Sequence, residues 1–116
     1  MRMRSPTVDE LEAEWLSGED CTMSDGLAEP FADPEAVWQA VLRIMQRKLT
    51  EEQISLLAAG PVEDLLAHYG ALFIDRIEAE AQRSPAFAHA LGGVWRRDIP
   101  QEIWQRVETA RGGAVW

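Results

Sequence analysis

Several features that would reveal a chemical function are missing from this sequence. Cys21 is the only cysteine, so no disulfide forms within the chain, and a lone thiol with no basic neighbour in sequence fits an inert side chain in a reducing cytosol. The chain has no HExxH, GxSxG, Walker or CxxC motif, and its two histidines have no local metal-ligand spacing. No apolar run approaches the roughly 20 residues of a membrane span, and no apolar segment of a secretory signal follows the two N-terminal arginines. We therefore expect a cytoplasmic protein with no cofactor, no metal and no membrane partner.

Basic residues are missing from a long stretch near the N-terminus. Residues 5–42 contain ten acidic side chains and neither lysine nor arginine, whereas the whole chain has a net charge of −9. Such a surface repels phosphate backbones and attracts basic proteins. We therefore expect no direct nucleic-acid binding and a protein partner with a basic surface. The simpler alternative is that these acids keep a small protein soluble.

Alternating strand patterns longer than a few residues are also absent, and the apolar periodicity indicates helices throughout. A length of 116 residues predicts one all-α domain, with an acidic N-terminal helix and connector over 1–32 and a helical core over 33–111. The positions of capping residues, proline and glycine predict six or seven short helices packed as antiparallel hairpins. Either an irregular bundle or a HEAT-like helical fragment would fit, although no repeat of fixed period supports a true solenoid.

The helix ends are marked by capping residues, proline and glycine. Four N-terminal caps are predicted from Thr7 with Glu10, Asp33 with Pro34, Thr50 with Gln53, and Ser84 with Pro85. Gly60 and Gly70 are expected to end helices and Pro61 to begin one, which predicts three separate helices between residues 50 and 83.

The stretch GPVEDLLAHYG, residues 60–70, comes nearest to an active site. Asp64 and His68 are four residues apart, so a carboxylate could orient an imidazole as a general base, or the pair could bind a metal with Asp75 or Glu78. Every residue of the stretch except His68 also has a structural role, because acids suit the first helical turn. We favour the structural interpretation, with a small enzyme or metal-binding protein using Asp64 and His68 as the alternative.

Tryptophan is abundant, with five residues: Trp15, Trp38, Trp95, Trp104 and Trp116. The apolar helix faces that carry Trp38 and Trp104 place both in the expected core. Trp95 precedes Arg96 and Arg97, a composition favoured at interface hot spots, although a core position in the last hairpin is the alternative. Trp15 lies on a helix too short to be stable unless it packs on something.

Four linked segments resemble a small bacterial domain family of unknown function: GPVEDLL (60–66), FIDRIEAEA (73–81), LGGVW (91–95) and EIWQRV (102–107). The resemblance covers residues 38–107. It implies a bacterial, intracellular, all-α protein and carries no activity with it. The acidic N-terminal third lies outside the resemblance, where a role particular to this member could reside.

Together these features predict a bacterial or phage-encoded protein that is not an enzyme and acts by binding another protein. One form would be an acidic inhibitor, an immunity-type or anti-defence protein that covers a basic surface. The residues expected to bind the partner are Glu10, Glu12, Glu14, Trp15, Glu19, Asp20, Trp95, Arg96 and Arg97. A homo-oligomeric structural module joined through the tryptophan-bearing helices is a further alternative.

Overall fold

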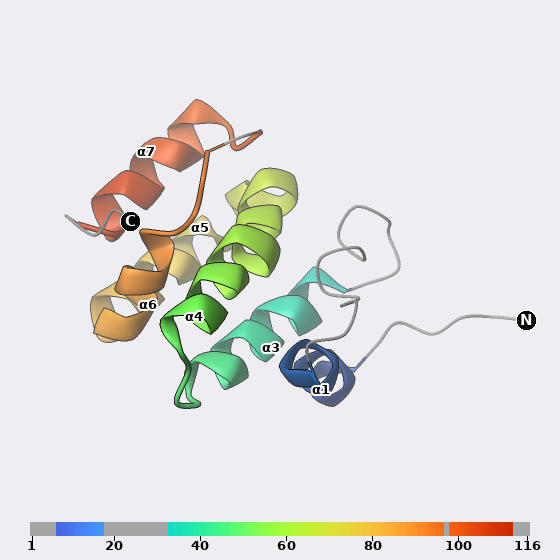
Figure 1. Ribbon diagram of the computed structural model, residues 1–116. Coiled ribbons are helices and arrows are strands. Elements are labelled where there is room, and N and C mark those ends of the chain that lie inside the picture. Colours follow the sequence, from blue (N-terminus) through green and yellow to red (C-terminus); the bar gives the residue numbers. More distant parts are fainter. Residues whose placement is uncertain (1–6, 18–32, 97, 113–116) are drawn as a thin grey trace, which may run out of the picture.

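The computed structural model describes residues 7–17, 33–96 and 98–112. About 80% of these residues are helical and none is in a strand, so the described part of the chain is all-α. Its elements are α1 (Val8–Ser17), α3 (Pro34–Met45), α4 (Glu51–Leu57), the π-helical segment η1 (Ala58–Val62), α5 (Glu63–Arg83), α6 (Pro85–Leu91) and α7 (Gln101–Ala110) (Figure 1). No described helix combines the length and the apolar character that crossing a membrane requires.

The four predicted N-terminal caps are confirmed. At α1, the Glu10 N–H donates to Thr7 Oγ1 at 3.2 Å and the Thr7 N–H donates to Glu10 Oε1 at 3.0 Å. Thr50 and Gln53 make the same reciprocal pair at the start of α4. Each pair satisfies two backbone donors that a helix leaves unpaired at its N-terminus. The single side-chain caps of α3 and α6 are Asp33 and Ser84.

The prediction that Gly60 ends a helix and Pro61 begins another is wrong. Both residues lie inside η1, and α4, η1 and α5 follow one another without a break. Proline has no N–H to donate and its ring crowds the carbonyl four residues earlier. The wider π-turn, which contains one more residue than an α-turn, lets the helix continue past the ring. The described residues therefore form five continuous helical rods rather than six or seven separate helices.

The prediction that Gly70 ends a helix is confirmed in part. Tyr69 has non-helical dihedral angles, with φ −136° and ψ 26°, so two helical segments of α5 meet there at a kink, and the second continues to Arg83. Gly70 is buried, and a Cβ atom at this position would lie 3.0 Å from Cγ2 of Ile103 in α7. The glycine is needed for the close approach of α7 to α5.

The rods are arranged approximately in chain order (Figure 1). Helix α1 packs on α3, the α4–η1–α5 rod lies beside α3, and α7 packs on α5 at the other side of the molecule. Because α6 contacts α4, η1, α5 and α7, the segment from α6 to α7 runs along the long rod.

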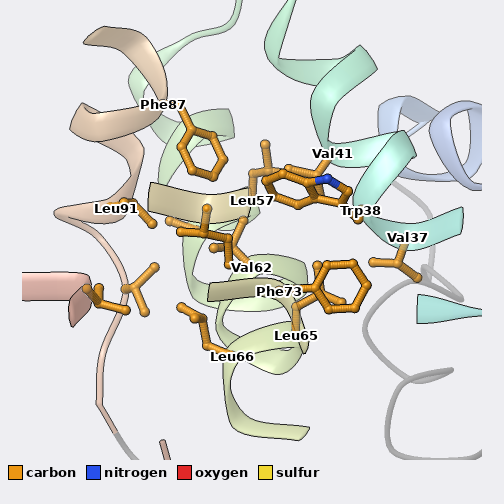
Figure 2. Close-up of a cluster of buried hydrophobic side chains, with 14 of the residues drawn as sticks. Val37, Trp38, Val41, Leu57, Val62, Leu65, Leu66, Phe73, Phe87 and Leu91 are labelled. Carbon is orange, nitrogen blue, oxygen red and sulfur yellow. The ribbon is translucent and has the colours of Figure 1, made fainter. Parts of the chain in front are cut away.

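Trp38 lies in the core, as predicted. Its indole lies between Phe73 and Phe87, at centroid distances of 6.2 Å and 5.7 Å (Figure 2). Such aromatic pairs contribute about 0.5–1.5 kcal/mol each beyond the burial of their area. Trp104 is only partly buried, with the guanidinium carbon of Arg111 5.1 Å from its ring centroid.

Helix α1 is tied to α3 by one buried side chain and by ion pairs. Leu11 is fully buried in the core. Arg43 pairs with Asp9, and Arg47 Nε donates to Glu12 Oε2 at 3.0 Å. A helix of ten residues is marginal in water by itself. These contacts with α3 therefore account for its stability.

Candidate functional site

Trp95 lies in the segment between α6 and α7 and presents its side chain to solvent. The residue is 69% exposed, whereas the core side chains around Trp38 are buried. Its backbone N–H donates to Oε1 of Glu63 at 2.9 Å, and Glu63 is only 5% exposed. A buried carboxylate of α5 thus holds the backbone that carries an exposed indole.

The residues beside Trp95 form a turn. The Ile99 N–H donates to the Arg96 carbonyl at 2.8 Å, and Arg96 Nε donates to the Ile99 carbonyl at 3.3 Å. Arg96 itself is exposed. Arg97, the other arginine expected to bind a partner, lies outside the described residues. Trp95 and Arg96 are therefore presented together at the start of a hydrogen-bonded turn.

Several of the acidic side chains of α1 have structural partners. Glu12 is paired with both Arg43 and Arg47, and its side chain is only 15% exposed. Glu10 accepts the Thr7 N–H as part of the N-terminal cap. Arg43 donates a hydrogen bond to Asp9, and this bond raises the pKa of the Arg43 guanidinium above its ordinary value.

The other partner-binding candidates near the N-terminus are placed only in part. Trp15 is partly buried and packs against the core. Glu14 is partly exposed and has an interaction partner, so it is not a free charge. Glu19 and Asp20 lie outside the described residues. Figure 1 shows α1 and the segment from α6 to α7 on different sides of the molecule, so the two predicted contact surfaces do not form one patch.

A groove of about 360 Å³ opens at the kink of α5. Its walls are residues 66–72 of α5 and Pro100, Glu102 and Ile103 at the start of α7. Leu72, one of the wall residues, is 70% exposed. Leu66 is three residues after Glu63, so the groove begins about one helical turn from the point that holds Trp95.

His68 is exposed and lines this groove. Its ring centroid lies 6.5 Å from that of Tyr69. Asp64 is partly buried and has an interaction partner, and its proposed role in orienting the imidazole stays a prediction.

The additional acids considered as metal ligands are also engaged elsewhere. Asp75 Oδ1 lies 2.5 Å from Arg106 Nη2, and Glu78 Oε2 accepts from Arg106 Nε at 2.9 Å. These two carboxylates raise the pKa of Arg106 above its ordinary value. Within residues 7–17, 33–96 and 98–112, no group of three or more His, Cys, Asp and Glu side chains is placed to hold a metal ion.

One known protein family matches nearly the whole chain. The model of a family of unknown function (DUF6869) matches residues 5–115. The chain belongs to this family. The match is wider than the range 38–107 on which the resemblance was based, and it includes the acidic N-terminal segment that the resemblance left outside. Neither the curated proteins nor the solved structures include a match to this chain.

Three residues of these surfaces were missed from the sequence. The sequence indicates for Glu63 a favourable position in a helix dipole and hydrogen bonds from free backbone N–H groups or from Arg76. Its contact with Trp95, 32 positions later, leaves no local signal. Leu72 did leave one: it is an apolar residue out of step with the buried stripe of Phe73 and Ile77. Glu102 has the appearance of any first-turn acid, and only the groove beside it distinguishes it.

Proposed function

We propose that the protein is a non-enzymatic binding protein, that its partner is another protein, and that Trp95 anchors the contact. The observation that carries this proposal is the 69% exposure of an indole whose backbone is held by a buried carboxylate. A tryptophan without a binding role is expected to bury most of its large apolar surface.

The position of Trp95 suits a binding anchor for two reasons. Tryptophan and arginine are the residues most enriched at interface hot spots, and Arg96 follows Trp95 directly. The hydrogen bond to Glu63 also restrains the loop before a partner arrives. Less conformational entropy is then lost on binding, so more of the contact energy appears as affinity.

The partner in this proposal has a basic surface. The chain has a net charge of −9, which would steer a cationic protein towards it. Among the described acids, Asp9 and Glu12 are already paired with arginines of the same chain. We therefore infer that α1 contributes charge at longer range and that Trp95, rather than α1, makes the central contact.

An inhibitor or immunity-type protein that covers a basic surface of its target is the form of this function that fits the small size and the acidity. We further infer that the five rods pack as an irregular bundle of antiparallel hairpins. Such a scaffold would hold the segment from α6 to α7 in one position.

The test is affinity capture from cells that naturally produce the protein, with wild type, Trp95→Ala and Leu56→Ala as baits. Leu56 on α4 is a matched control, since it is also apolar and 59% exposed. We expect Trp95→Ala to weaken the affinity for the partner by about thirtyfold, which corresponds to the roughly 2 kcal/mol of a hot spot. Leu56→Ala should retain it.

Circular dichroism of all three baits checks that the substitutions leave the helices intact. Equal capture by wild type and Trp95→Ala would refute the role of Trp95. Light scattering over a range of concentrations tests the rival homo-oligomer: self-association that Trp95→Ala abolishes would make the partner a second copy of the chain.

A further inference from the structure

The groove at the kink of α5 has apolar walls and an acidic residue at its rim. Leu66, Leu72 and Ile103 contribute the largest aliphatic side chains, and Glu102 is the only carboxylate among the lining residues. Glu102 is exposed in the first turn of α7, and it makes no ion pair with any residue of the described ranges.

The kink and the packing of α7 together produce this groove. Tyr69 departs from helical geometry, so α5 changes direction there. The neighbouring Gly70 has no side chain to keep Ile103 away. The groove therefore follows from the fold of the two helices and needs no rearrangement to open.

An exposed apolar side chain and a carboxylate with no ion pair among the described residues occur together at this groove. Leu72 is 70% exposed on the wall, which is the largest exposure of any large apolar side chain in the described chain. Other acids of α5, Asp75 and Glu78, are paired with Arg106. No cation among the described residues pairs with Glu102, so a ligand that covers Leu72 could supply one.

We propose that this groove binds a basic amphipathic helix of the partner protein. Apolar side chains of that helix, spaced three or four residues apart, would cover Leu72 and enter the groove towards Ile103. A lysine or arginine beside them would pair with Glu102. The inference rests on the proposed function, because the groove adjoins the segment held by Glu63. The basic helix would belong to the same partner protein that Trp95 contacts.

The probe is a short amphipathic helical peptide of leucine and lysine, titrated into the ¹⁵N-labelled protein. A peptide of leucine and glutamate with the same pattern is its control. The lysine peptide should shift the backbone amides of residues 66–72 and 101–103, and the glutamate peptide should not. Shifts spread over the surface, or equal binding of both peptides, would overturn the proposal.

Two matched pairs of variants locate the contact. Leu72→Asp should weaken binding of the lysine peptide by about tenfold or more, whereas Leu56→Asp, an equally drastic change at another exposed leucine, should not. Glu102→Gln should weaken it several-fold. Glu52→Gln removes an exposed first-turn acid of α4, outside the groove, and should have no effect. Equal effects within either pair would contradict the assignment.

The same titration separates this inference from the proposed function. If Trp95→Ala loses the cellular partner but the lysine peptide still binds at the groove, both proposals hold and the two contacts are independent. If Trp95→Ala keeps the partner while Leu72→Asp loses it, the groove is the contact and the anchor role of Trp95 fails. Self-association that Leu72→Asp removes, with no peptide shift, would show that a second copy occupies the groove and would overturn the proposal.

Discussion

Replacing Glu63 tests whether a buried carboxylate positions the segment that carries Trp95. Glu63→Ala removes the only hydrogen-bond acceptor that the structure shows for the Trp95 N–H, at 2.9 Å. Leaving a buried or half-buried donor without a partner costs about 1–3 kcal/mol. We expect the free energy of unfolding to fall by about 1–3 kcal/mol, because Glu63 follows η1 without a break and no helix-dipole contribution is added at this position.

Glu63→Gln separates the charge from the hydrogen bond. Glutamine keeps a carbonyl oxygen that can accept from the Trp95 N–H, but a neutral acceptor makes a weaker bond than a carboxylate does. We expect a loss of about 1 kcal/mol, clearly less than for Glu63→Ala. Glu52→Ala is the control for a first-turn acid that is exposed, and it should cost less than about 1 kcal/mol.

Urea unfolding followed by far-ultraviolet circular dichroism measures these three differences, and amide hydrogen exchange of Trp95 reports on the local contact. Exchange at this amide should speed up by about tenfold or more in Glu63→Ala, since 1.4 kcal/mol corresponds to a factor of ten. If Glu63→Ala costs no more than Glu52→Ala, or if the exchange of the Trp95 amide is unchanged, Glu63 does not hold this segment.

Three further predictions concern the fold. Thr50→Ala should lower the free energy of unfolding by about 1 kcal/mol in urea, because it removes an N-cap acceptor, and no loss would contradict the capping contact. Gly70→Val should cost about 1–3 kcal/mol by overpacking against Ile103, and Ile103→Ala in the same chain should recover part of it. Hydrogen bonds from Gln39 and from Arg76 lower the pKa of Glu35 below its ordinary 4.5. Its contribution to stability should be present above pH 4.5 and lost as the pH falls through the lowered pKa, and Glu35→Gln should remove that part of the acid titration.

Local signals predicted the fold where each helix end depends on a few adjacent residues. Thr50 and Gln53 lie three residues apart, and their reciprocal hydrogen bonds follow from the geometry of any helix N-terminus. Gly112, with a φ of +62°, directly follows Arg111, the C-cap residue of α7, where glycine is the favoured residue. Such features require no knowledge of the tertiary structure.

The prediction failed where tertiary packing overrides local preference. Pro61 is usual at the first position of a helix, and nothing nearby in the sequence reveals that a π-turn will carry the chain past it. Gly70 has the appearance of a helix stop, and α5 does kink at the residue before it. The sequence nearby does not reveal Ile103, a residue 33 positions later, whose Cγ2 would lie 3.0 Å from a Cβ atom at position 70.

The candidate surfaces could be predicted only in part. Trp95 was identified because an indole beside arginine is typical of interfaces, but its exposure depends on the fold. Asp64 and His68 were identified from helical spacing, and the groove that His68 lines depends on the fold. Spacing shows which side chains share a helix face, but it does not show whether they form a contact.

The stretch at 60–70 has a role, although it differs from the one that its acids and histidine suggested. One added residue in the π-turn rotates every later side chain of the rod by about 100° around the helix axis. Glu63, which follows that turn directly, is thereby buried beneath the segment of Trp95. At the other end of the stretch, the kink at Tyr69 and the missing side chain of Gly70 open the groove beside α7. Two irregularities of one helix, eleven residues apart at most, thus account for both surfaces that we propose the partner contacts.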